Sequence, residues 1–133
     1  MKQKIRKTDK GIMVVNIIAF VIGIIIFFIS KDSSNERKNE RKQHVRYSIG
    51  ITTDVHHNPR SSSKIIDFQY SFKDTTYTSY GTIGWLDNTV NTKGGKYYVE
   101  FSYINPKNCK MLFDRPVPMD IISSPDTGWV TIP

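Results

Sequence analysis

Three residues that could bind a metal or transfer a proton lie close together in the sequence, at Asp54, His56 and His57. Imidazole and carboxylate groups are common ligands of transition metals and common general acids and bases. Adjacent residues of a strand point to opposite faces, so His56 and His57 do not readily share one ion. We interpret the group as part of a polar loop that ends at Asn58-Pro59, and we keep an enzyme site at Asp54, His56 and His57 as the alternative.

The other side chains that could act as nucleophiles or hold a phosphate lack the partners that such chemistry needs. The single cysteine, Cys109, has no histidine near it in the sequence to act as its base. The serine run at 61–63, followed by Lys64, has no nucleophile elbow around it, and residues 94–96 (Gly-Gly-Lys) lack the other positions of a phosphate-binding loop. We therefore predict no catalytic residue, no metal, no cofactor and no enzymatic activity.

Tyrosine is unusually frequent in the second half of the chain, with six residues between positions 70 and 103. Tyrosine is enriched at protein interfaces, because its ring contributes area and its hydroxyl contributes a hydrogen bond. Tyr77, Tyr80 and Tyr98 form a candidate interaction surface if they are exposed on one face. The alternative is that these rings pack across neighbouring strands, which is the commoner use of tyrosine in sheets.

The basic excess of the chain is confined to its first third. Residues 1–46 contain 11 Lys and Arg against 4 Asp and Glu, whereas residues 47–133 contain 8 of each kind. A nucleic-acid-binding fold needs its basic surface on the folded part, which here is neutral overall. The basic residues instead flank an apolar stretch, where anionic lipid head groups attract each of them by about 1 kcal/mol. We predict a lipid bilayer as a partner and no nucleic acid.

The apolar stretch covers residues 12–29, which carry no charge and include 14 Ile, Val or Phe residues. As a helix it is about 27 Å long, close to the ~30 Å thickness of a bilayer core. Its insertion is favoured by about 4 to 8 kcal/mol. The stretch is longer than the apolar region of a cleaved signal peptide, and no small-x-small cleavage site follows it. We predict a transmembrane helix at residues 12–30 that acts as an uncleaved signal anchor.

The distribution of basic residues around this stretch predicts its orientation. Five basic residues lie between positions 2 and 10, whereas only Lys31 lies within the seven positions after the stretch. The positive-inside rule then places residues 1–11 in the cytoplasm and the rest of the chain outside. We expect a single-pass protein of the cytoplasmic membrane of a bacterium, with an extracytoplasmic C-terminal domain. A single cysteine is compatible with that compartment.

Residues 31–46, KDSSNERKNERKQHVR, have Val45 as their only apolar residue. On a helix, their period of four would stack Glu36 over Glu40 and Arg37 over Arg41, and like charges at this spacing are mildly destabilising. We expect a charged, solvated linker that packs against nothing, with at most one helical turn beyond the membrane.

Residues 47–133 have the composition of a small β domain with a C-terminal tail. Runs rich in β-branched and aromatic residues alternate with turn residues. The runs predict strands near 46–54, 64–72, 75–83, 96–104 and 110–113. Five short strands with short connections fit a small antiparallel barrel or a curled sheet. The predicted fold class is therefore all-β, preceded by one N-terminal transmembrane helix.

Period-two patterns and turn residues add detail to this domain. Two strands should each place alternate residues in the core: Ile66, Phe68, Tyr70 and Phe72 on one, and Tyr97, Val99, Phe101 and Tyr103 on the other. Lys73-Asp74 predicts a tight hairpin, and Asn105, Pro106 and Asn108 predict a structural turn. The tail after Pro116 is expected to cover an edge of the sheet through Ile121, Ile122, Trp129 and Val130.

The stretch GGKYYVEFSYINPKNCKMLFDRPVP, residues 94–118, resembles small bacterial membrane-anchored proteins of unknown function. That family carries one or two membrane spans beside a compact β domain. Its pattern is an aromatic-x-aromatic segment with a short turn, here residues 67–78, followed by a Gly and a strand that ends in an Asn-Pro turn, here residues 95–108. The resemblance covers roughly residues 47–118. It implies an extracytoplasmic β domain and carries over no catalytic residue.

These observations favour a membrane-anchored binding or accessory protein that presents its β domain outside the cytoplasmic membrane. An envelope protein is the expected partner. The sequence leaves the oligomeric state open. Two alternatives remain: an envelope enzyme with a site near Asp54, His56 and His57, and an immunity-type or stress-related membrane protein.

Overall fold

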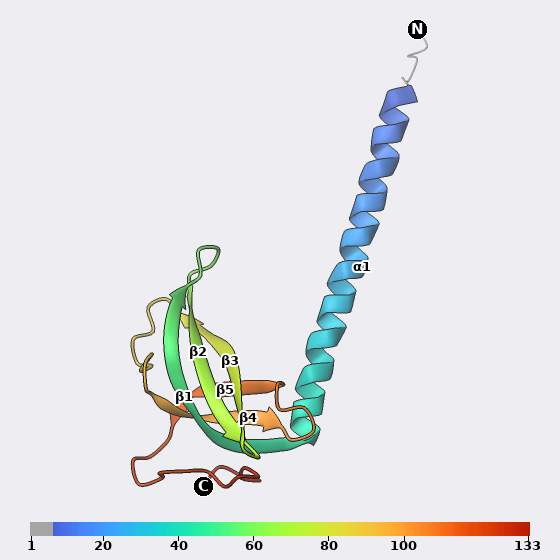
Figure 1. The fold of residues 1–133 in the computed structure, drawn as a ribbon. Coiled ribbons are helices and arrows are strands. Elements are labelled where there is room, and N and C mark those ends of the chain that lie inside the picture. Colours follow the sequence, from blue (N-terminus) through green and yellow to red (C-terminus); the bar gives the residue numbers. More distant parts are fainter. Residues whose placement is uncertain (1–6) are drawn as a thin grey trace. The chain divides into compact units, whose positions relative to one another are not determined.

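The computed structural model describes residues 7–133, which form one helix followed by one five-stranded sheet (Figure 1). The elements are α1 (Lys7–Gln43), β1 (Val45–His57), β2 (Ser63–Phe72), β3 (Thr75–Gly84), β4 (Lys96–Ser102) and β5 (Cys109–Pro116). The chain divides into two compact units between Lys38 and Asn39, and we call the second, residues 39–133, the β unit. Residues 1–6 of the expected cytoplasmic segment 1–11 lie outside the described residues.

Helix α1 contains the apolar stretch predicted to cross a membrane. Its Ile, Val and Phe side chains are exposed all around the helix, from 40% at Ile24 to 72% at Phe20. A helix that is apolar on every side needs an apolar environment on every side. Within residues 7–133, α1 is the one helix long and apolar enough to span a bilayer, and it is therefore compatible with single-pass membrane anchoring. A signal sequence has the same length and composition.

The expected linker at residues 31–46 is helical for most of its length, which corrects the sequence-based prediction. The helix α1 continues to Gln43, and Val45 and Arg46 already belong to β1. Glu, Lys, Arg and Gln are good helix formers, and extending an existing helix needs no new nucleus. These gains outweigh the small repulsion between like charges four residues apart. The last turn of α1, from Asn39 to Gln43, belongs to the same compact unit as the sheet.

The five strands form an antiparallel sheet in the order β3-β2-β1-β4-β5. The central strand β1 is long and is shared: Val45 to Ile51 pair with β4, and Gly50 to His57 pair with β2. A bulge between Thr52 and Asp54 adds to the curvature of this strand. Figure 1 shows β1 sweeping around the sheet in an arc.

The sheet is curled but not closed into a barrel, so the curled-sheet form of the predicted fold is confirmed and the barrel form is not. β3 and β5 are the two ends of the strand order and do not pair with each other. Because neighbouring strands alternate in direction, β3 and β5 run the same way. Side chains cover part of the seam, since the Phe113 ring lies against Gly81, where an added Cβ would be 2.7 Å from the ring.

The core lies on the concave side of the sheet and consists mostly of the residues predicted for it. Ile66, Phe68, Tyr70 and Phe72 of β2 are buried, together with Tyr97, Val99 and Phe101 of β4. The prediction was wrong for Tyr103, which is exposed because β4 ends at Ser102. Rings of Tyr70 and Phe72 both lie about 5 Å from the ring of Phe101, which joins the two strands through the core.

Both predicted turns are confirmed. Lys73 and Asp74 have φ angles of 48° and 60°, the two left-handed residues of a tight hairpin between β2 and β3. In the turn between β4 and β5, the Asn108 N–H donates to the Asn105 carbonyl at 2.8 Å, and the Ser102 N–H donates to the Asn108 carbonyl at 3.1 Å.

The tail after β5 covers one edge of β1 through its backbone. Trp129 and Tyr47 exchange two backbone hydrogen bonds of 2.8 and 2.9 Å, and the Lys73 N–H donates to the Asp126 carbonyl at 2.9 Å. The tail therefore pairs with β1 beyond the residues of β1 that pair with β2. Trp129 and Ile121 are partly buried as expected, but the prediction was wrong for Ile122 and Val130, which are exposed.

Candidate functional site

The three candidate tyrosines do not share one exposed face, so the predicted surface of Tyr77, Tyr80 and Tyr98 does not exist as a unit. The ring of Tyr77 stacks on Tyr70 at 5.5 Å and packs against the core. Tyr98 lies on the opposite face of the sheet from the core but is buried beside Trp129. Tyr80 alone is well exposed, at 68%. Positions 77 and 80 are three apart on a strand, and the period of two sends them to opposite faces.

Tyr80 stands beside a shallow hollow on the convex face of the sheet. The hollow is lined by Tyr80 together with Thr53, Asp67, Gln69 and Thr78. Tyr80 and Asp67 are directly opposite in the pairing of β2 with β3, and the bulge in β1 supplies Thr53. Hydroxyl, amide and carboxylate groups around one exposed ring provide hydrogen-bond partners for a polypeptide surface.

The strand that carries Tyr80 is an edge strand without the usual protection against pairing. β3 has the sequence TTYTSYGTIG, which contains no charge and no proline, and it stands at one end of the strand order, with no strand paired to its outer side among residues 7–133. Natural edge strands are commonly blocked by Lys, Pro or a covering loop. The other edge strand, β5, carries Lys110, Asp114, Arg115 and Pro116. β3 is therefore the edge strand better suited to contact another chain.

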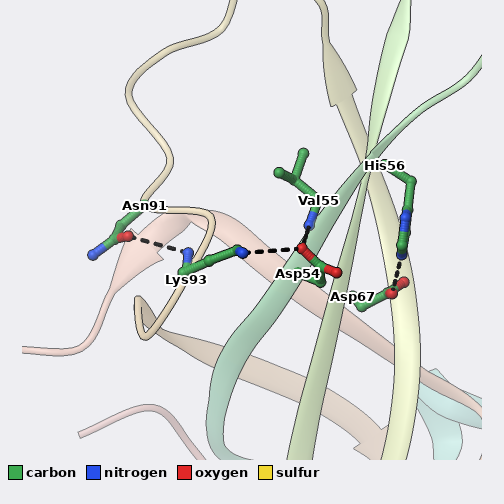
Figure 2. A network of polar contacts seen from close by, with 6 residues as sticks. All are labelled: Asp54, Val55, His56, Asp67, Asn91 and Lys93. Atoms are coloured by element: carbon green, nitrogen blue, oxygen red, sulfur yellow. Dashed lines mark hydrogen bonds and ion pairs between the residues drawn. The ribbon is translucent and has the colours of Figure 1, made fainter.

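A network of polar contacts occupies the convex face next to this hollow (Figure 2). His56 Nε2 lies 2.6 Å from Asp67 Oδ2, and Lys93 Nζ lies 3.5 Å from Asp54 Oδ1. The Val55 N–H donates to Asp54 at 2.9 Å. This hydrogen bond, followed by the charge of Lys93, lowers the pKa of the Asp54 carboxyl below its ordinary value. The charged side chains of these pairs are substantially exposed, so their contacts add little to the stability of the fold.

Asp54, His56 and His57 do not converge on one point, although they are close in sequence. Each has a different partner: Asp54 contacts Lys93, His56 contacts Asp67, and the ring of His57 lies 4.2 Å from that of Trp85. Within residues 7–133, no group of three or more His, Cys, Asp or Glu side chains is arranged to hold a metal ion. The structure therefore does not bring together the site that the enzyme alternative names.

The contact between His57 and Trp85 belongs to a surface that the sequence analysis missed. We call it the distal tip: His57 at the end of β1, residues 58–62 of the loop between β1 and β2, and Trp85 and Leu86 just after β3. The signal for it was available, because Trp85-Leu86 places two large apolar residues side by side in a connection otherwise rich in Gly, Asn and Thr. Only the pairing of β2 with β3 brings the two loops to the same end of the sheet.

Cys109 lies in a partly buried cluster under the turn between β4 and β5. Burial is the main cause that raises the pKa of its thiol, although hydrogen bonding to Ser79 opposes the shift. The neighbouring Tyr70 hydroxyl donates to the Pro106 carbonyl, and burial raises its pKa strongly. A thiol whose pKa is raised is a poor nucleophile at neutral pH. This cluster serves packing and turn formation.

The last turn of α1, from Asn39 on, belongs to the β unit and contacts the sheet through polar groups around Asn108. Arg41 Nε donates to Glu100 at 2.8 Å, and Arg41 Nη1 donates to the Asn108 side-chain oxygen at 3.1 Å. The Asn108 amide donates in turn to Glu40 at 3.3 Å. Arg41 is largely buried, so these charge-assisted bonds are stronger than surface ion pairs. Asn108, which the sequence predicts as a turn residue, therefore also links the last turn of α1 to the sheet.

Comparison with known proteins gives no match: no family model, no curated protein and no solved structure matches the chain. Membership in the family of small bacterial membrane proteins with a compact β domain thus stays a prediction. The function has to be inferred from the helix, the surfaces of the β unit and their chemistry.

Proposed function

We propose that the chain is a single-pass protein of the bacterial cytoplasmic membrane whose β unit is a binding module on the outer side. In this proposal α1 is the anchor, the N-terminus is in the cytoplasm and another envelope protein is the partner. The observation that carries the proposal is the contrast between the two units: the apolar side chains of α1 are exposed all around, whereas the β unit has its own buried core. Such a helix needs lipid, and such a domain needs none.

The convex face and free edge of β3 are the contact surface in this proposal, with Tyr80 at its centre. Three features support this choice: the exposure of Tyr80, the hollow beside it and the uncharged edge of β3. An extended segment of a partner can pair with the backbone of Thr75 to Thr78, while Tyr80 packs on its side chains. Exposed aromatic residues next to hydrogen-bonding groups are typical of binding surfaces.

A reporter fused after Pro133 tests the orientation. A reporter that is active only outside the cytoplasm should be active in this fusion. In a matched fusion, the five basic residues at positions 2, 4, 6, 7 and 10 are replaced by Gln, which removes the charge bias that orients the helix. Its reporter activity should fall. An inactive first fusion would contradict the proposed side of the membrane.

Photocrosslinking tests the contact surface in cells of the source organism. A photoreactive residue at Tyr80 should yield a discrete adduct with an envelope protein, whereas the same residue at Ile122, which is also exposed, should not. Thr76→Lys places a charge on the free edge of β3 and should reduce the Tyr80 adduct without unfolding the domain. Equal adducts from Tyr80 and Ile122, or an adduct that Thr76→Lys leaves unchanged, would count against β3 as the surface.

A further inference from the structure

The distal tip is held in one shape by contacts between its two loops. The Trp85 N–H donates to the Ser62 carbonyl at 3.2 Å, and the Asp87 N–H donates to the Gly84 carbonyl at 3.0 Å. Lys64 Nζ donates to the Asp87 carbonyl at 3.1 Å and lies 5.7 Å from the centre of the Trp85 ring. The surface is therefore formed before any ligand arrives.

The exposed part of the distal tip combines apolar and basic side chains. Leu86 is 87% exposed and Trp85 is 46% exposed, although each is among the most apolar residues of the chain. Arg60 is also exposed, and its guanidinium has no hydrogen-bond or ion-pair partner among residues 7–133. Together with Lys64 it outweighs the one carboxylate nearby, Asp87, whose side chain is occupied by Thr89.

This combination is the one that binds the interface of a bilayer. Tryptophan prefers the depth of the lipid head groups, leucine prefers the start of the acyl chains, and arginine and lysine are attracted by anionic phosphates. We propose that the distal tip docks on the anionic surface of the membrane that α1 anchors. The inference rests on the membrane anchoring in the proposed function, but on neither the partner protein nor the side of the membrane.

Docking of the distal tip on lipid needs no second protein. A test with the purified chain and lipid alone therefore distinguishes a lipid partner from a protein partner at this site.

The chain offers an internal probe, because Trp85 and Trp129 are its only tryptophans. The full-length Trp129→Phe variant has Trp85 as its single fluorescent indole. It is reconstituted in nanodiscs of phosphatidylglycerol whose acyl chains are brominated near the head group, and in matched phosphatidylcholine discs. If Trp129→Phe does not fold, the same signal follows from the difference between the wild type and Trp85→Phe.

We expect bromine to quench about half of the Trp85 emission in anionic discs and much less in zwitterionic discs. High salt should reduce the quenching, as should Leu86→Asp or the pair Arg60→Ser and Lys64→Ser. Met119→Asp places the same charge on an exposed apolar residue of the tail and should leave the quenching unchanged.

The proposal is overturned if, in anionic discs, the fluorescence of Trp85 is quenched by aqueous acrylamide but not by bromine. That result would favour a protein partner for the distal tip. Equal quenching in both kinds of disc would overturn the role of the basic residues. Failure of the proposed anchoring has a different signature, because the chain would then not co-migrate with the discs at all.

Discussion

The apolar residues of α1 and those of the sheet are of the same types but have opposite surroundings. Ile66 and Phe68 of β2 are fully buried by protein, whereas Ile24 and Phe20 of α1 are exposed. In the sheet, apolar residues recur at every second position, so one face can fold over itself and exclude water. In the helix they occur at nearly every position, so no single protein face can cover them. Pattern, more than composition, decides whether the protein itself can bury an apolar residue.

The largest expected effect concerns insertion of the helix. Replacing Val21 and Ile22 by Arg puts two charges near the middle of the apolar stretch, at a cost of about 5 to 7 kcal/mol, comparable to the whole favourable sum. The variant should leave the membrane fraction in carbonate extraction. Met119→Arg combined with Ile122→Arg, two charges on exposed residues of the β unit, should stay in that fraction. If both double variants behave alike, the helix is not the anchor.

The second effect separates the two kinds of apolar residue by stability. Phe68→Ala removes a buried ring from the core and should lower the free energy of unfolding of the β unit by about 3 to 5 kcal/mol. Phe20→Ala in α1 removes the same ring from an exposed site and should leave that unfolding transition in place. Chemical denaturation of the full chain in detergent, followed by the near-ultraviolet signal of the β unit, measures both. Equal losses would mean that the helix is part of the core.

Two buried tyrosines of the sheet should respond to loss of the hydroxyl with opposite signs. The Tyr98 hydroxyl is buried and has no hydrogen-bond partner among the described residues, so Tyr98→Phe should raise the free energy of unfolding by up to about 1 kcal/mol. The Tyr70 hydroxyl donates to the Pro106 carbonyl, so Tyr70→Phe should lower it by about 1 kcal/mol. Urea titrations of both variants would show this difference, and a loss in both would mean that Tyr98 does have a partner.

The smallest effect concerns the pH dependence of Cys109. Its pKa in the folded chain is raised by burial, so the folded state keeps the proton at pH values where the unfolded chain loses it. The stability that depends on this proton is therefore present below the ordinary thiol pKa of about 8.5 and is lost as the pH rises through the folded value. Relative to Cys109→Ala, the wild type should lose stability above that pH. Alkylation of the native thiol at pH 8 should be several-fold slower than in urea.

The sequence was a good guide to each feature that depends on neighbouring residues. The alternation at Ile66, Phe68 and Tyr70 predicted both a strand and its buried face, and Lys73-Asp74 predicted the hairpin that follows. The uncharged stretch at residues 12–29 predicted a helix. Local geometry decides these features, because strand and helix periods act over a few residues.

Features that depend on distant residues were missed or misjudged. The end of the charged segment became ordered because Arg41 meets Glu100 and Asn108, more than fifty residues away. The candidate tyrosines do not form one surface, because Trp129 of the tail lies beside Tyr98 and Tyr77 packs against the core. The distal tip was missed although Trp85-Leu86 pointed to it, because only strand pairing brings its two loops together.

The sequence by itself determined the apolar helix, the strands, their inner faces and both tight turns, because each of these features depends on residues that are close along the chain. Only the tertiary structure decided that the sheet curls without closing, that the tail completes the edge of β1, and which side chains of the convex face remain exposed. The physical reason is that burial and pairing depend on which distant backbone groups and side chains meet, and that is settled by the packing of the whole domain.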